Sequence, residues 1–96
     1  MLNSKQRAFL RSMGHSLDTI FQIGKGGLTD EIAKQILNAL EARELIKVRV
    51  LENSGYTAKE AAEKLADAVG CDVVSSVGSR FILYKESENK KRIILP

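Results

Sequence analysis

The residues of this sequence with the clearest capacity for chemistry are Gly24, Lys25, Gly26 and Gly27. Glycines leave backbone N–H groups unshielded by side chains, so an anionic oxygen can approach them closely, and Lys25 adds a mobile positive charge. This combination predicts a loop that contacts phosphate. The alternative role is a tight strand-to-helix turn in which glycine only supplies positive φ.

The position of a phosphate on this loop depends on the acidic residues that follow it. Asp30 and Glu31 fall in the first turn of a predicted helix, where they suit the helix dipole and compete with a phosphate for its positive end. We therefore expect a bound phosphate to lie over Gly26 and Gly27 and not on the helix axis.

Basic residues form the second candidate site. Lys5, Arg7 and Arg11 precede the first acidic residue of the chain. The two arginines lie one helical turn apart, and their planar guanidinium groups suit bidentate contacts to successive phosphates. Lys47 and Arg49 alternate with apolar residues on a predicted strand, which gives that strand a basic outer face. A solvated polar surface is the alternative for both groups.

The sequence contains no recognisable catalytic motif. Lys25 is followed by two glycines where a Walker loop has Ser or Thr, and the upstream glycine of that loop is missing. Cys71 is the single cysteine, so the chain cannot build an intramolecular disulfide or a thiolate zinc cluster. We expect no enzymatic activity, no cofactor, no metal site and no small-molecule substrate.

The composition is that of one modestly basic domain. The chain has 96 residues, 44% of them hydrophobic, and a formal charge of +3. Such a length supports a single core, and the charge favours an anionic partner. No apolar stretch has the length of a signal peptide or a membrane span, so we expect a cytoplasmic protein without a membrane partner.

The apolar periodicity predicts helices and strands in the order α-β-α-β-α-β-β. A first helix over residues 3–13 should bury Phe9, Leu10 and Met13 and end at Gly14. The later elements are a strand at 19–23, a helix capped by Thr29, a strand at 45–51, a helix between Thr57 and Gly70, and strands at 72–77 and 80–85. This order predicts an α/β fold of the two-layer α+β type, with a four-stranded mixed sheet and three helices in one domain over residues 1–96. Residues 86–96 could form a loose tail or an extra edge strand.

Four segments of the sequence carry a resemblance to a known family, namely residues 5–7, 24–29, 45–50 and 78–85. Together they resemble the CRM domain, in particular its free-standing bacterial YhbY-type members, and the resemblance covers essentially the whole chain. It implies a fold similar to the C-terminal domain of translation initiation factor three. It also implies binding to structured RNA and association with precursors of the large ribosomal subunit, with the Gly-x-x-Gly loop and the basic first helix as RNA-binding elements.

The leading interpretation is a non-catalytic factor that holds ribosomal RNA and assists assembly of the large subunit, alongside other assembly factors as further partners. Two alternatives stay open. One is a general double-stranded nucleic-acid binder of the Alba type, and the other is a protein-interaction module that uses a sheet edge or the end of the chain. Phe81 and Tyr84 could stack on bases, although a chain with few aromatic residues is expected to bury them.

Overall fold

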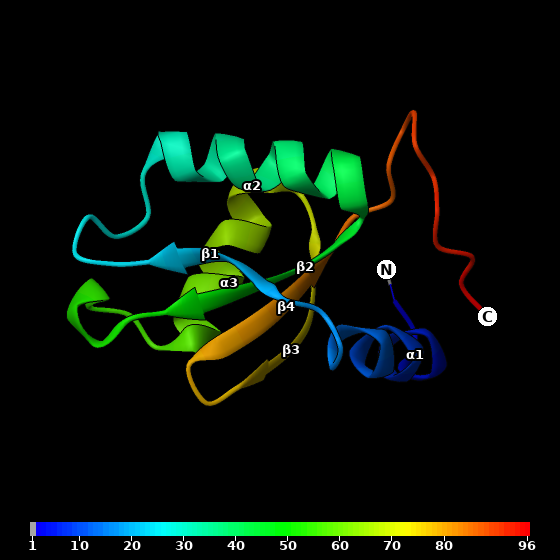
Figure 1. Cartoon of the computed structure of the whole chain (residues 1–96), viewed down its shortest axis with the longest axis horizontal. Helices are drawn as coiled ribbons and strands as arrows, with labels where there is room; N and C mark the ends of the chain where they lie inside the picture. The colour runs from blue at the N-terminus through cyan, green and yellow to red at the C-terminus, as the bar shows by residue number, and fades with distance from the viewer. Residues whose placement is uncertain (1) are drawn as a thin grey trace.

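The computed structural model describes residues 2–96 and confirms the predicted order of elements (Figure 1). The elements are α1 (Ser4–Gly14), β1 (Thr19–Ile23), α2 (Asp30–Arg43), β2 (Leu45–Val50), the short 3-10 helix η1 (Glu52–Ser54), α3 (Ala58–Val69), β3 (Asp72–Val77) and β4 (Arg80–Tyr84). The predicted α+β fold with a four-stranded mixed sheet is therefore confirmed.

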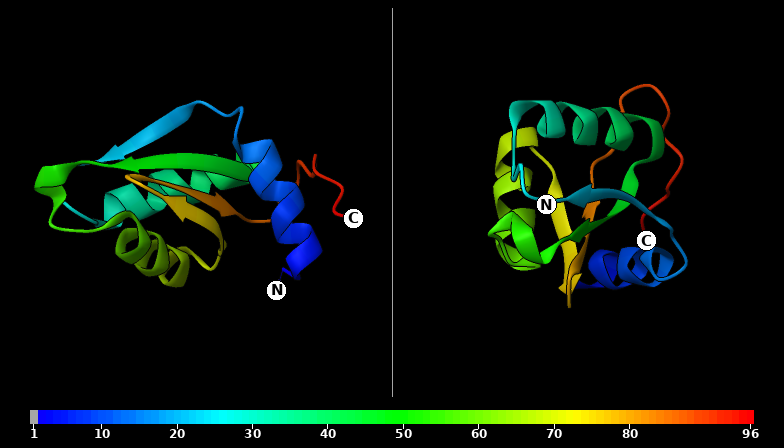
Figure 2. Two further views of the ribbon diagram at one scale, coloured as in Figure 1. Left: turned by 90° about the horizontal axis from the view of Figure 1, so that it is seen from below. Right: turned by 60° about the vertical axis from the view of Figure 1, so that its left-hand side comes forward.

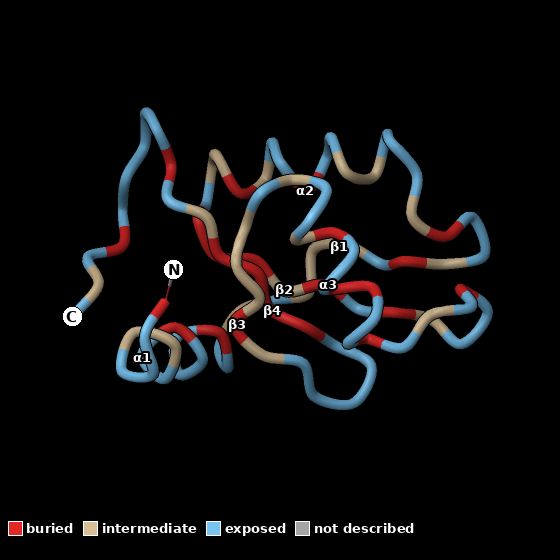
Figure 3. Tube along the Cα trace, turned by 180° about the vertical axis from the view of Figure 1, so that it is seen from behind, coloured by how far each residue is buried: buried red, intermediate tan, exposed pale blue. Residues whose placement is uncertain are grey.

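The strands lie in the order β1-β2-β4-β3. The pair β1 and β2 is parallel, because α2 crosses over between them, while β4 runs antiparallel to both β2 and β3. Gly78 and Ser79 join β3 to β4 in a two-residue loop, with Val77 opposite Arg80 and Gly78 at a φ of 60°. The turn is exposed along its length (Figure 3).

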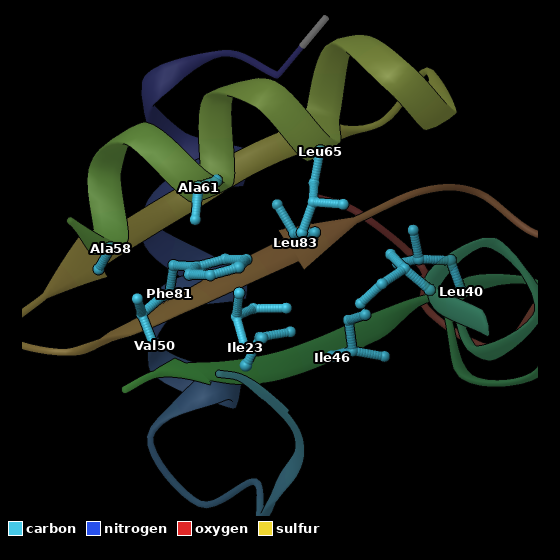
Figure 4. Close-up of a cluster of buried hydrophobic side chains, with 12 residues drawn as sticks. Ile23, Leu40, Ile46, Val50, Ala58, Ala61, Leu65, Phe81 and Leu83 are labelled. Atoms are coloured by element: carbon cyan, nitrogen blue, oxygen red, sulfur yellow. The ribbon is translucent and has the colours of Figure 1, made fainter. Parts of the chain in front are cut away.

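One face of the sheet is covered by α2 and α3 and holds the main core. Phe81 and Leu83 of β4 point into it together with Ile46 of β2 (Figure 4). On α3 the small Ala58 and Ala61 face the sheet, and their size lets the helix backbone approach it closely. The predicted alternation of β2, with its apolar residues on the inner face, is thus confirmed.

The opposite face of the sheet is covered only at one end, where α1 crosses it (Figure 2). Leu10 packs there against Leu45, Ile82 and Tyr84, which alternate along their strands with the residues of the main core. The rest of this face, toward the carboxyl ends of β1 and β2, carries no helix (Figure 2). We call this part the open face.

The sequence predicts that α1 ends at Gly14 because glycine stops a helix. The structure shows a different reason for this glycine. The helix includes Gly14, and His15 after it keeps a right-handed conformation, with a φ of -58°. Gly14 is buried, and a Cβ atom built on it would lie 2.3 Å from Cδ1 of Ile82. Glycine is present because the helix touches the sheet at this point.

The predicted apolar stripe of α1 is also corrected. Leu10 is fully buried, but Phe9 and Met13 each keep 38% of their surface exposed. The helix contacts the sheet through Leu10 and Gly14, and this contact turns the side of the helix that bears the larger apolar residues toward solvent. Helical periodicity marks candidate apolar positions but cannot tell which of two neighbouring stripes a sheet will cover.

Local signals fixed the start of α2 and both ends of α3 as predicted. The Thr29 side chain accepts a hydrogen bond from the N–H of Ile32 at the start of α2. Thr57 and Glu60 form a capping box at the start of α3, and Gly70 ends that helix with a φ of 70°. No helix in the described part of the chain has the length and apolar character needed to cross a membrane.

Residues 86–96 form neither a helix nor a strand, but hydrogen bonds attach them to the end of α2. The fully buried carboxylate of Glu44 accepts from the backbone N–H groups of Ser87, Arg92 and Ile93 at 2.8, 2.6 and 2.7 Å. Glu41 accepts from the hydroxyl of Ser87 and the N–H of Glu88. The segment thereby brings Ile93 into the cluster under α1.

Candidate nucleic-acid interface

The glycine loop lies at one end of the molecule, between β1 and α2 (Figure 1). The N–H of Gly27 donates to the carbonyl of Gly24 at 2.9 Å, so residues 24–27 form a closed turn. Gly27 is buried beside Tyr56 and has a φ of 68°, a value that favours glycine. Gly27 therefore has the alternative role given in the sequence analysis, that of a glycine that supplies a positive φ to a tight turn.

This turn changes the predicted position of a phosphate. Because the N–H of Gly27 is already used inside the chain, a phosphate cannot lie over both Gly26 and Gly27 with each N–H free. Within residues 2–96, the backbone N–H groups of Lys25 and Gly26 donate no hydrogen bond to another backbone group. The backbone N–H groups that can still donate to a phosphate are therefore those of Lys25 and Gly26, at the exposed tip of the loop.

Gly26 differs from Gly27 in what the fold demands. It is exposed, it lacks a positive φ, and a Cβ atom built on it would have nothing within 4 Å. A side chain at Gly24 would make only ordinary contact, at 3.5 Å from Leu51. The fold therefore requires glycine at position 27, while open backbone at Gly26 is of use to a molecule that approaches from outside.

The open face carries a row of cations across neighbouring strands. Arg49 of β2 lies directly opposite Arg80 of β4, and its other neighbour is Gln22 of β1. Two residues before Arg49 on β2, Lys47 lies opposite Ile82. Like charges directly opposite each other destabilise a sheet. Over the described chain the single salt bridge joins Lys91 to Glu86, so neither arginine is neutralised by a carboxylate.

The structure places the three predicted basic residues of α1 in different surroundings. Lys5 is exposed. Arg7 is partly buried, and its guanidinium donates to the carbonyl of Val73 at 2.7 Å, so it holds α1 to β3. Arg11 lies near Lys47 and Arg80 at the border between α1 and the open face. The three residues therefore do not form one free binding surface.

The structure also separates the loop from α1. The molecule extends 37 Å along its long axis, with the glycine loop at one end and α1 toward the other (Figure 1). An RNA that contacts both the loop and the first helix must therefore also pass over the residues between them. Arg49 and Lys47 on β2 lie between them, because β2 runs from the α1 end toward the loop end.

Sequence reasoning missed Arg80, although the signal was present. Arg80, Ile82 and Tyr84 alternate with Phe81 and Leu83, so once β4 was predicted the arginine had to share a face with Lys47 and Arg49 of its neighbour. The two aromatic residues of β4 are 1% and 5% exposed. Base stacking by them is excluded, and the expected core role is confirmed.

The single cysteine offers no activated nucleophile. Cys71 lies half-buried just before β3, and burial raises the pKa of its thiol to about 11, with the Asp72 carboxylate adding to the effect. A thiol with such a pKa stays protonated at neutral pH and reacts slowly. Its place at the entrance of a strand is structural.

The fold and the open face define a small α+β module with a row of cations on one side of its sheet. The model of the CRS1 / YhbY (CRM) domain matches residues 2–85, and the chain belongs to this family. The predicted resemblance is thus confirmed.

Relatives of the chain agree with this assignment. The chain is 50% identical to YqeI of Bacillus subtilis, named a probable RNA-binding protein, with both chains covered completely. It is 32% identical to an RNA-binding protein of Haemophilus influenzae, over 94% of this chain and 91% of that protein. The solution structure of a hypothetical Staphylococcus aureus protein, described as a candidate RNA binder, has a TM-score of 0.79 at 45% identity, with complete coverage of both chains.

Proposed function

We propose that this protein is a cytoplasmic, non-catalytic RNA-binding factor that holds structured ribosomal RNA during assembly of the large subunit. The observation that carries the proposal is the open face, where Arg49 and Arg80 lie side by side without a carboxylate partner. A fold that keeps two like charges at opposite positions of neighbouring strands gains from a polyanion that neutralises both. Relatives named as RNA-binding proteins make RNA the favoured polyanion.

The RNA contact in this proposal runs along the molecule. Lys25 and the N–H of Gly26 take phosphates at the loop, Arg49 and Arg80 follow on the sheet, and Arg11 ends the track at α1. The track follows the long axis of the molecule, whose full extent is 37 Å, so the bound RNA element must be an extended one. An A-form helix with a neighbouring loop meets this requirement, and its backbone and 2′-hydroxyl groups would supply most of the contacts.

Ribosomal RNA and the large subunit enter the proposal through the family resemblance. They are tested by sedimenting a cell lysate through sucrose gradients at low and at high salt. We expect the protein to migrate with large-subunit precursors at low salt and to leave them at high salt, because the attachment is electrostatic. A protein that stays at the top of both gradients would contradict a stable ribosomal role.

The contribution of the loop is tested by Lys25→Ala, with Lys64→Ala on α3 as the control for loss of one positive charge. We expect Lys25→Ala to weaken binding to structured RNA and to reduce the slope of log affinity against log salt by about 0.7 to 0.9, the value for one phosphate contact. Lys64→Ala should leave the slope unchanged. An unchanged slope for Lys25→Ala would remove this residue from the interface.

The same binding assay separates the alternative of a general double-stranded nucleic-acid binder. The proposal predicts tighter binding to structured RNA than to duplex DNA at equal salt, because the two helices differ in groove shape and only RNA carries a 2′-hydroxyl. Equal affinity for both would favour the Alba-type alternative. Association with a protein that survives nuclease treatment would favour the protein-interaction alternative.

A further inference from the structure

A hollow of about 230 Å³ lies where the end of α1 meets the open face. Arg11 and His15 border it from the helix side, and Lys47 and Arg80 border it from the strands. No carboxylate is found among the described residues that line it. Its rim therefore suits an anion.

Two lining residues of the hollow are apolar, and we call them its floor. Ile82 is 8% exposed, and Val77 is 75% exposed although it lies on a strand, so Val77 offers the larger accessible apolar side chain. The wall next to Ile82 is Gly14, whose missing side chain brings the helix backbone against the isoleucine. The hollow thus combines an apolar floor with a cationic rim in one small space.

Lys47 fixes one edge of the hollow. Its ammonium group lies 3.5 Å from the carbonyl oxygen of His15, to which it donates, so the side chain extends across the gap between β2 and the end of α1. The ammonium has two further N–H groups for an outside acceptor. The rim is therefore partly arranged before any ligand arrives.

We infer that this hollow seats one unpaired nucleotide of the bound RNA, with its base on Ile82 and Val77 and its phosphates on Arg11, Lys47 and Arg80. The inference rests on the proposed function and deepens it by naming the kind of RNA: a helix interrupted by a bulge or joined to a loop. A base has apolar faces and stands next to a charged backbone, which matches a floor and a rim of these two kinds.

Size and shape favour an unpaired nucleotide over a regular duplex. Pockets for drug-sized ligands measure about 300 to 1,000 Å³, so the hollow suits a single base and not a larger group. A paired base lies inside its helix and cannot enter a concave site, whereas an unpaired base can be turned out of the stack.

The test compares two RNAs that share a stem of about 16 base pairs, one fully paired and one with a single bulged nucleotide. The bulged position carries a fluorescent adenine analogue. We expect the wild-type protein to bind the bulged RNA about tenfold more tightly, and to change the fluorescence of the analogue, because the base leaves water for an apolar floor.

The matched variants are Val77→Ser and Ile94→Ser, which remove apolar surface at two exposed positions. Val77→Ser should reduce the preference for the bulged RNA about fivefold while the affinity for the paired stem stays the same. Ile94→Ser lies outside the hollow and should keep the full preference. Both substitutions are at exposed side chains, so folding is retained.

The outcomes separate this inference from the proposed function. Equal affinity of the wild-type protein for the two RNAs would overturn the inference and leave RNA binding intact. A full preference in Val77→Ser would show that the unpaired nucleotide lies elsewhere, which also overturns it. Absence of binding to either RNA would contradict both proposals together.

Discussion

The two faces of the sheet have different compositions and different roles. The face under α2 and α3 is closed and apolar, with Phe81 and Leu83 of β4 fully covered. The other face is closed only under α1, and beyond it Arg49 and Arg80 stand opposite each other. Both faces are made by the same strands, whose side chains alternate between them.

This difference shows how a small domain separates stability from binding. Burial of apolar surface on the closed face supplies most of the free energy of folding, so the open face is free to carry residues that weaken the sheet. Changes on the closed face should therefore act on the free energy of unfolding. Changes on the open face should act on affinity for an anion.

The largest effect is expected on the closed face, from Phe81→Ala. The substitution leaves a cavity in the main core and should lower the free energy of unfolding by about 3 to 5 kcal/mol. Urea denaturation followed by circular dichroism measures this loss. A loss below about 1 kcal/mol would mean that the closed face does not dominate stability.

The next largest effect is expected at residues 86–96, the segment that brings Ile93 into the cluster under α1. Burial acts to raise the pKa of Glu44, but hydrogen bonds from the N–H groups of Ser87, Arg92 and Ile93 outweigh it and hold the pKa below the ordinary 4.5. The carboxylate therefore stabilises the fold above the pKa of the unfolded chain, and this stability is lost as the pH falls through the lower folded value.

The variant Glu44→Gln tests this attachment at neutral pH. An amide has one oxygen acceptor where the carboxylate has two, so at least one N–H group is left unsatisfied, at about 1 to 3 kcal/mol. Because Oε2 of Glu44 accepts from Ser87 and Oε1 accepts from Arg92 and Ile93, hydrogen exchange should become faster at the amide of Ser87 or at those of Arg92 and Ile93, whichever faces the new NH₂ group. The control Glu63→Gln, at an exposed position on α3, should leave their exchange unchanged, and equal rates in both variants would exclude Glu44 as the anchor.

A smaller effect compares two neighbouring glycines of the loop. Gly27→Ala should destabilise the protein by about 1 kcal/mol, because residue 27 has a φ of 68°. Gly26→Ala should leave the melting temperature unchanged and weaken RNA binding, since the added methyl group meets only open space in the fold. Unchanged RNA affinity in Gly26→Ala would contradict a close approach of phosphate at this position.

Features that depend on neighbouring residues in the sequence were predictable. The capping box of Thr57 and Glu60 and the left-handed Gly70 fix α3 within a few residues, and the Gly78-Ser79 turn fixes the register of β3 against β4. These signals act locally, so a single sequence carries them.

Features that depend on distant contacts were not predictable in the same way. The hydrogen bond from Arg7 to Val73 and the attachment of residues 86–93 to Glu44 join parts of the chain that no local pattern connects. In the sequence, Gly14 has the pattern of a glycine that ends a helix. In the structure, glycine is required at this position because the helix contacts Ile82. The hollow likewise became visible only when α1 was placed on the sheet.

The most direct test of the separation between the faces is the double variant Arg49→Ala/Arg80→Ala, measured for both stability and salt-dependent binding to structured ribosomal RNA. We predict a free energy of unfolding that stays within about 0.5 kcal/mol of the wild type or rises, since a like-charge pair is removed. The salt slope should fall by about 1.4 to 1.8, the value for two phosphate contacts. An unchanged slope and affinity would contradict the account, because the open face would then not be the surface that binds RNA.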